Sequence, residues 1–438
     1  MIPHVDDTHD PSLRSWVQSA SRATDFPIQN LPFGVFRRAE TNEPGRVGIA
    51  IGDMILDVGA ARRAGHFTGD AAAAARACEQ PSLNALMAGG RAWWGALRRA
   101  VSALLREGSG AERDASSLLV SMRDAEMLLP AHVGDYSDFY ASIHHATNVG
   151  SMFRPDNPLL PNYKYVPIGY HGRASSLVQS GTRVQRPCGQ RKGPNDPAPS
   201  FGPSKSLDYE CEVGAFIGPG NLLGERIPMA TACEQIFGLC LVNDWSARDV
   251  QSWEYQPLGP FLAKSFATTL GPWVVTMEAL APFRVPAAER PAGDPAPLEY
   301  LRDDGDLARG GVDIVVEVAI RTRAMRQRGE HEARVSRARF ADMYWTMGQM
   351  VTHHASNGCN LRPGDLIASG TISGPTRDAR GCLLELTWRG AEPLSLPGGE
   401  TRTFLEDGDE VILRGACERA GYARIGFGEC RGTILAAS

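Results

Sequence analysis

The sequence contains no long block of one charge, no internal repeat and no apolar run of the roughly 20 residues that span a bilayer. Its 45 basic and 50 acidic residues are interspersed, which excludes the basic patch typical of nucleic-acid-binding proteins. The first 25 residues lack the basic and apolar regions of a signal peptide. We therefore expect a cytoplasmic protein that binds neither nucleic acid nor a membrane.

Cysteine usage excludes two further classes. The nine cysteines are odd in number and include no Cys-x-x-Cys pair, so we predict buried free thiols rather than a disulfide framework or a zinc site. A chain of 438 residues can bury a sizeable core and exceeds one typical domain. We therefore expect two domains of unequal size.

Changes in pattern along the chain suggest the domain boundaries. Residues 1–25 form a polar, irregular extension that we expect to pack weakly or to carry a short helix. Residues 26–128 combine short apolar runs, separated by turns, with an Ala-, Leu- and Arg-rich stretch at 71–107 that predicts two helices. Residues 129–438 alternate strand-like runs with Pro and Gly turns, which is typical of a mostly antiparallel β domain.

Several segments of this larger domain have specific assignments. We predict strands at 164–169, 207–217, 237–243 and 382–388, helices after Asp244 and over about 340–355, and a long surface loop at 281–311.

An acidic stretch stands out within this domain. Asp208, Glu210 and Glu212 alternate along a predicted strand, so their carboxylates share one face. Like charges placed in this way are tolerated where water screens them or where a cation binds between them. The stretch indicates either an acidic solvent-exposed face or a site for a hard divalent cation such as Ca²⁺ or Mg²⁺.

Candidate partners for such a site are scattered along the chain. Asp138 lies in an aromatic turn seven residues before His145, so one short segment supplies a carboxylate and an imidazole. Asp244 follows a buried strand and precedes a helix, where it is equally well explained as a functional group or as a helix-capping residue. The helix start has a capping-box form at Ser246–Asp249.

Further polar side chains follow Asp244. Arg248, Gln251 and Tyr255 recur at i, i+3 and i+7 and therefore share one helical stripe. Lys264 is flanked by apolar residues and needs an anionic partner. The glycine-flanked Thr371 suits close approach of a ligand to backbone and hydroxyl.

Taken together, six motifs resemble those of the fumarylacetoacetase family, and the resemblance extends from Phe26 to the C-terminus. The motifs are Gly134–Tyr140, His145–Gly150, Gly169–Ser176, Asp208–Glu212, Asn243–Asp249 and Ser369–Pro375. The resemblance implies a mainly β fold with some α, in which a small SH3-like N-terminal domain precedes a mixed β-sandwich roll. It also implies a homodimer that uses Ca²⁺ and/or Mg²⁺ to hydrolyse 4-fumarylacetoacetate in tyrosine and phenylalanine catabolism.

The same resemblance assigns residue roles. It makes His145 the general base with Glu385 as its orienting partner, and it leaves Asp208 outside the metal ligands. Arg248, Gln251 and Lys264 would stabilise negative charge. The implied metal ligands are Asp138, Glu210, Glu212 and Asp244, and the implied substrate contacts are Tyr140, Arg154, Tyr170, Arg248, Gln251, Tyr255 and Thr371.

A second cation in the family lies near the positions of Lys264 and Thr268. This chain has Ala263 and Ala267 where family members usually have Gly.

Two alternatives remain at this stage. A related acylpyruvate hydrolase or oxaloacetate decarboxylase would share the carboxylates but not the full pocket. A non-catalytic metal-binding structural protein would need the carboxylates but not His145 and Glu385.

Overall fold

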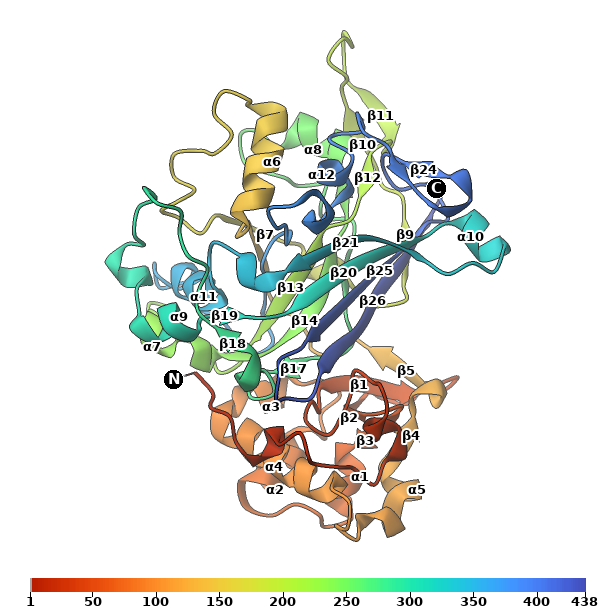
Figure 1. The fold of residues 1–438 in the computed structure, drawn as a ribbon, viewed down its shortest axis with the longest axis vertical. Coiled ribbons are helices and arrows are strands. Elements are labelled where there is room, and N and C mark those ends of the chain that lie inside the picture. The colour runs from red at the N-terminus through yellow and green to blue at the C-terminus, as the bar shows by residue number, and fades with distance from the viewer. Residues whose placement is uncertain (1) are drawn as a thin grey trace.

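The computed structural model describes residues 2–438 and confirms a mainly β architecture with some helices (Figure 1). A smaller N-terminal part, red to orange, lies below a larger part whose sheets curl around a second core.

The N-terminal part is built on a five-stranded antiparallel sheet with the order β4-β3-β2-β1-β5. The stretch 71–107, predicted to form two helices, forms three: α2 (Gly69–Ala77), α3 (Asn84–Ala88) and α4 (Gly90–Leu105). Gly90, at a φ of 72°, separates the second from the third. The strands are β1 (Phe33–Arg38), β2 (Arg46–Ile51), β3 (Met54–Asp57), β4 (Leu119–Ser121) and β5 (Ala125–Leu128), and the helices are α1 (Val58–Arg63), α2 (Gly69–Ala77), α3 (Asn84–Ala88), α4 (Gly90–Leu105) and α5 (Ala115–Leu118).

The N-terminal extension packs more closely than its polar sequence suggests. It carries two short 3-10 turns, Asp7–His9 and Gln18–Ser21. The Trp16 indole donates to the carbonyl of Leu104 at 2.9 Å, and His9 Nε2 lies 2.8 Å from the carbonyl of Glu278. The extension therefore contacts both α4 and the larger part of the chain.

Two large sheets form the C-terminal part. The first has the order β7-β6-β22-β13-β14-β16-β8, with β17 also paired to β14, and the second has the order β21-β20-β25-β26-β9. The strands of the first are β6 (Tyr136–Phe139), β7 (Gly169–His171), β8 (Leu177–Gln179), β13 (Cys211–Ile217), β14 (Ile236–Asp244), β16 (Thr268–Leu270), β17 (Val275–Thr276) and β22 (Leu366–Ala368). Those of the second are β9 (Arg183–Gln185), β20 (Val315–Arg321), β21 (Ala333–Arg339), β25 (Glu410–Cys417) and β26 (Ile425–Leu435).

Short ribbons and helices complete this part. The ribbons pair β10 (Cys188–Arg191) with β11 (Ser200–Pro203), β12 (Leu207–Asp208) with β15 (Ser246–Ala247), β18 (Arg284–Val285) with β19 (Gly311–Val312), and β23 (Leu394–Ser395) with β24 (Thr401–Arg402). The helices are α6 (Ile143–Phe153), α7 (Met229–Ala232), α8 (Arg248–Glu254), α9 (Asp304–Arg309), α10 (Arg323–Gln327), α11 (Met347–His354) and α12 (Leu383–Leu386).

Several segment predictions are wrong. Residues 164–166 form a turn rather than a strand, and residues 281–311 contain β18 and α9 rather than one long loop. The predicted strand at 382–388 contains the helix α12, because the carboxylate of Asp208 accepts the backbone N–H groups of Leu383 and Leu384 at its first turn. The predicted capping box at Ser246 does not form, since Ser246 and Ala247 pair with β12 before α8 begins.

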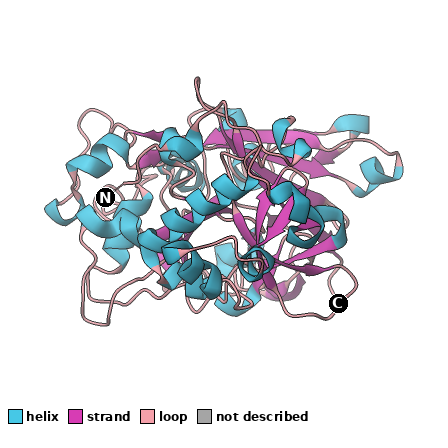
Figure 2. Cartoon of the chain, turned by 90° about the horizontal axis from the view of Figure 1, so that it is seen from below, coloured by secondary structure: helices cyan, strands magenta, loops and turns pink. Residues whose placement is uncertain are grey.

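The small part is anchored directly to the sheet that carries the acidic residues. Phe237 of β14 packs against Phe33 at 5.7 Å and Trp94 at 5.2 Å between ring centroids. Seen from below, helices cover much of the near face and strands lie behind them (Figure 2). Among residues 2–438, no helix has the length and apolarity to cross a membrane.

Candidate metal and catalytic site

Neighbouring strands bring four carboxylates together. Asp138 is the penultimate residue of β6, Glu210 immediately precedes β13, Glu212 lies at its start, and Asp244 ends β14. One oxygen from each side chain lies within 4.8 Å of the others, and all four side chains are buried. The interpretation of the acidic stretch as a solvent-exposed face is therefore wrong for Glu210 and Glu212.

The charges in this cluster are incompletely balanced. Burial, with the neighbouring Asp244 carboxylate, raises the pKa of Asp138 well above its ordinary value. Burial and the carboxylates of Asp138 and Asp244 do the same to the pKa of Glu212. Both carboxylate oxygens of Glu212 are buried without a hydrogen-bond partner in the described part of the chain, residues 2–438. An all-oxygen cluster with unpartnered acceptors suits a hard divalent cation, so the residues fit Ca²⁺ or Mg²⁺.

Side chains of Lys264, Thr268 and Tyr170 donate hydrogen bonds to the cluster. Lys264 Nζ donates to Glu210 and, at 2.9 Å, to Asp244. The Thr268 hydroxyl donates to Asp244 at 2.7 Å, and the Tyr170 hydroxyl donates to Asp244 at 2.8 Å and to Asp138 at 3.1 Å. Burial opposes ionisation of Glu210, but Lys264 and Arg248 outweigh it and lower the pKa of Glu210. Lys264 and Arg248 thus both place a positive charge against the carboxylates.

A histidine–glutamate pair lies beside the cluster. Ser142 caps α6 by accepting the backbone N–H of His145, which fixes that residue in the first turn. His145 Nδ1 lies 2.6 Å from Glu385 Oε2. This contact leaves Nε2 of His145 for proton transfer.

Further donors surround Glu385. Its carboxylate accepts hydrogen bonds from Asn148 and Ser373, each at 2.8 Å, and from the Cys382 thiol at 3.2 Å. Burial opposes ionisation, but His145 and these donors outweigh it and lower the pKa of Glu385 to about 2. Asn148 and Ser373 lie within the motifs His145–Gly150 and Ser369–Pro375, and Cys382 begins the segment predicted as a strand, but no role at the site was predicted for any of the three.

Asp208 and Arg248 form the next layer. Arg248 Nε donates to Asp208 Oδ2 at 2.9 Å, while its Nη1 lies 2.7 Å from Glu210 and 3.1 Å from the Gln251 amide oxygen. Asp208 lies outside the four-carboxylate cluster, as expected. It connects Arg248 to the first turn of α12, which carries Glu385.

The predicted substrate residues are only partly brought together. Tyr140 packs its ring edgewise on His145 at 5.2 Å, and Thr371 has a buried hydroxyl without a partner. Tyr255 follows the C-terminal end of α8. Arg154 follows α6, where its Nη2 donates to the carbonyl of Pro158 at 3.2 Å. The structure thus places Arg154 in a local loop contact rather than against the cluster.

One glycine is required for this geometry. Gly370 has a φ of 74°, and a Cβ there would lie 2.1 Å from the carbonyl oxygen of Phe139. Its backbone N–H donates to Asp138 Oδ1 at 3.1 Å. The bare backbone of Gly370 therefore helps to orient one carboxylate of the cluster.

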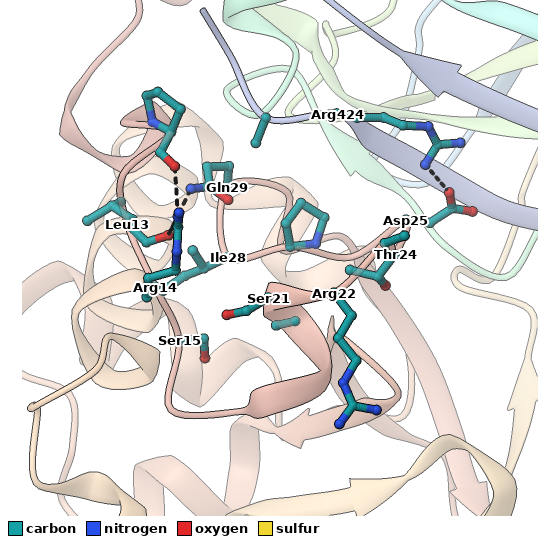
Figure 3. Close-up of a pocket in the computed structure, with 15 residues that line it drawn as sticks. Leu13, Arg14, Ser15, Ser21, Arg22, Thr24, Asp25, Ile28, Gln29 and Arg424 are labelled. Atoms are coloured by element: carbon teal, nitrogen blue, oxygen red, sulfur yellow. Dashed lines mark hydrogen bonds and ion pairs between the residues drawn. The ribbon is translucent and has the colours of Figure 1, made fainter.

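A separate hollow of about 530 Å³ lies between the N-terminal extension and the turn before β26 (Figure 3). Arg14 donates to the carbonyls of Pro11 and Leu13, and Arg424 pairs with Asp25. The side chain of Arg22 points away from Arg14 and Arg424. These three cations do not converge on one point, so the hollow has no arrangement that indicates a ligand.

Comparisons with known proteins cover both parts of the chain. Residues 29–130 match the family model described as Fumarylacetoacetase N-terminal, and residues 136–435 match the one described as Fumarylacetoacetate (FAA) hydrolase C-terminal. The chain is 51% identical to a fumarylacetoacetase of Caenorhabditis elegans, over 97% of this chain and 100% of that protein. It is 50% identical to that of Homo sapiens, over 94% and 97%.

A solved structure has the same fold at lower identity. The fumarylacetoacetate hydrolase from psychrophilic Exiguobacterium antarcticum is 17% identical, with a TM-score of 0.51 and coverage of 93% of this chain and 99% of that one. The family models and the near-full-length relatives together show that this chain belongs to the fumarylacetoacetase family.

Proposed function

We propose that this protein hydrolyses a carbon–carbon bond of 4-fumarylacetoacetate to give fumarate and acetoacetate, the last step of tyrosine and phenylalanine breakdown. One observation carries the proposal: a buried cluster of four carboxylates lies beside a His145–Glu385 pair, in a chain about half identical to fumarylacetoacetases over nearly its whole length.

The carboxylates of Asp138, Glu210, Glu212 and Asp244 would hold Ca²⁺ and/or Mg²⁺. When bound, the cation would supply a Lewis acid that polarises the oxygens of the 1,3-dicarbonyl. A second cation near Lys264 and Thr268 stays a prediction. The Lys264 ammonium has no lone pair for a metal, so Thr268 and backbone carbonyls would supply its ligands.

His145 is the proposed general base. Its Nε2 removes a proton from water as the water oxygen attacks the carbonyl beside the alkene, and Glu385 holds the Nδ1–H tautomer. The carbon–carbon bond then breaks, and its electron pair leaves with the acetoacetate fragment. The imidazolium of His145 returns the proton to that carbon. General-base catalysis of this kind contributes about 10²- to 10⁴-fold.

Three side chains can stabilise the negative charge that develops. Among residues 2–438, Arg248 Nη2 has no hydrogen-bond partner. The Gln251 amide, whose oxygen accepts from Arg248, carries two N–H donors, and Lys264 has a third N–H beyond its two contacts. Losing one preorganised donor typically costs about 3 to 4 kcal/mol of transition-state stabilisation. The contacts of Tyr140, Arg154, Tyr170, Tyr255 and Thr371 with substrate remain predictions.

We also propose the homodimer implied by the resemblance. The segment after α8 exposes Leu258 at 96%, Phe261 at 68% and Leu262 at 51% of their surfaces. Apolar side chains gathered in this way are typical of a surface covered by another chain. A cytoplasmic location remains the expectation from the sequence.

Steady-state kinetics on three compounds test the proposed substrate. We expect kcat/KM for fumarylacetoacetate to exceed that for acetylpyruvate or oxaloacetate by more than about 10²-fold, or roughly 2.7 kcal/mol of transition-state binding. A preference for either short acid would favour an acylpyruvate hydrolase or an oxaloacetate decarboxylase. Absence of turnover on all three would favour a non-catalytic metal-binding protein.

A further inference from the structure

A cationic hollow of about 330 Å³ opens beside Arg248, between the β10–β11 ribbon, α8 and α12. Five basic side chains line it: Arg191, Lys192, Lys205, Arg248 and Arg389. The lining also holds two acidic residues: Asp249 accepts from the Ser204 hydroxyl and the Lys205 backbone, and Asp196 accepts from the Gly193 backbone. Arg248 is paired with Asp208 and Glu210, but the other four basic residues outnumber these two carboxylates, so the hollow is net positive within a chain of formal net charge −5.

Two of these arginines have buried donors without acceptors. Arg248 is 7% exposed, and its Nη2 is buried with no partner among residues 2–438. The Nε and Nη1 atoms of Arg191 are likewise buried and unpartnered in the described part of the chain. Unmade hydrogen bonds of buried charged groups are costly, so an anion that supplies acceptors here would be favoured.

The hollow adjoins the reacting centre. Arg248 lines it and also contacts Glu210 of the carboxylate cluster, and its lining residue Leu384 immediately precedes Glu385. Phe153 and Phe404 add apolar walls, and the Arg389 guanidinium lies 4.7 Å from the centroid of the Phe153 ring. Cationic groups beside apolar walls suit a short carbon chain that ends in a carboxylate.

Two residues with implied substrate contacts already have other partners. Tyr170 donates its hydroxyl to Asp138 and Asp244, and Arg154 Nη2 donates to the carbonyl of Pro158, which leaves one buried Arg154 donor, Nε, without a partner among residues 2–438. We infer that the cationic hollow beside Arg248 is a carboxylate-binding subsite for a small dicarboxylate, with Arg191 and Lys192 as specificity-determining residues. The identification of the dicarboxylate as fumarate, or as the fumaryl end of the substrate, rests on the proposed function.

The test neutralises the subsite without touching the catalytic residues. The variant Arg191→Gln/Lys192→Gln removes two charges from the ribbon, and Arg183→Gln, an exposed arginine of β9, is the matched control. Calorimetric titration of the metal-loaded protein with fumarate measures binding without turnover. We expect the double variant to raise the Kd for fumarate at least tenfold and the control to leave it within twofold, with acetate binding unchanged in both. Circular dichroism and thermal unfolding establish that each variant is folded.

A second measurement reports the same site independently. Lys192 Nζ lies 5.8 Å from the centroid of the Trp253 ring, so fumarate should change the tryptophan fluorescence of the wild type but not that of Trp253→Phe, which should still bind fumarate. In kinetics, the double variant should raise KM for fumarylacetoacetate at least tenfold and change kcat less than threefold.

The outcomes separate this inference from the proposed function. Unchanged fumarate binding in the folded double variant overturns the subsite, even if fumarylacetoacetate is hydrolysed. Lost fumarate binding in the double variant supports the subsite even if fumarylacetoacetate is not hydrolysed, in which case the proposed function fails alone.

Discussion

Asp208 and Arg248 form a fully buried ion pair, with Arg248 Nε 2.9 Å from Asp208 Oδ2. The same carboxylate accepts backbone N–H groups from Tyr209, Leu383 and Leu384 at 2.7 to 3.0 Å. One side chain outside the carboxylate cluster thereby fixes both a proposed charge-stabilising arginine and the helix that carries Glu385. Asp208 is a positioning residue in this arrangement.

The first prediction separates Asp208 from the proposed cation ligands. Asp208→Asn should lower kcat at least tenfold and the free energy of unfolding by about 3 kcal/mol, because it turns an amide N–H₂ toward existing donors and removes one of the two buried carboxylates that pair with Arg248. Bound metal should stay stoichiometric. Glu210→Gln should instead weaken cation binding at least tenfold. Metal titrations with both proteins measure this, and equal losses of affinity would place Asp208 among the ligands.

The second prediction concerns the base. His145→Ala should lower kcat by about 10²- to 10⁴-fold while metal content and KM change little, since the residue acts in the chemical step. His144→Ala is the matched control and should keep near-normal turnover. It changes the adjacent histidine of α6, whereas His145 is the histidine that contacts the Glu385 carboxylate among residues 2–438. Loss of activity in the opposite order would make His144 the base.

The sequence predicts which site residues cluster better than it predicts the framework that holds them. Motif resemblance identifies the four carboxylates and the His145–Glu385 pair, which lie close together in the structure. Alternation alone would have put Asp208 on the same face as Glu210, but the strand breaks between β12 and β13 and Asp208 turns to α12.

Local sequence pattern also predicts the wrong structure for segments that are fixed by contacts distant in the sequence. The leucine-rich segment Leu383–Leu386 favours a strand by composition. It forms a helix instead, because the Asp208 carboxylate, 175 residues earlier, accepts the backbone N–H at its first turn. From its sequence, the N-terminal extension is predicted to pack weakly. The prediction fails because Trp16 and His9 bind partners far along the chain, the carbonyls of Leu104 in α4 and of Glu278. Long-range pairing of this kind leaves no periodic signal in the sequence.

The third prediction follows from the pKa of Glu385, which is lowered from its ordinary value of 4.5 to about 2. A lowered carboxyl pKa means that the ionised form stabilises the folded state, by roughly 3 kcal/mol here. This contribution is fully present above about pH 4.5 and is lost as the pH falls through about 2. Glu385→Gln should therefore be less stable than the wild type at pH 7, and the difference should shrink as the pH drops below 4.5.

Urea unfolding at pH 7, 5 and 4 measures this difference. Asp378→Asn, which removes an exposed carboxylate bonded to Thr376, is the control and should show a small difference at every pH. A Glu385→Gln difference that grows toward low pH would contradict the assigned direction.

The fourth prediction concerns the cation. Lys264 and Arg248 balance only part of the charge of the four buried carboxylates: Asp138 and Glu212 have raised pKa values, and both oxygens of Glu212 lack a partner among residues 2–438, so a bound cation relieves the remaining repulsion. Thorough chelation should therefore abolish activity and also lower the unfolding temperature, because a ligand that binds only the folded state stabilises it by about 2.7 kcal/mol at 100 times its Kd. Ca²⁺, Mg²⁺ or Mn²⁺ should restore both properties, since these ions favour oxygen ligands.

A variant of the cluster tests the same site. Glu212→Gln should lose the stabilisation by added cation. Glu317→Gln is the control and should keep it, because Glu317 of β20 accepts from Arg334 of β21, away from the cluster. Full activity in chelated protein that elemental analysis finds metal-free, or restoration by Zn²⁺ alone, would exclude a hard-cation site at Asp138, Glu210, Glu212 and Asp244.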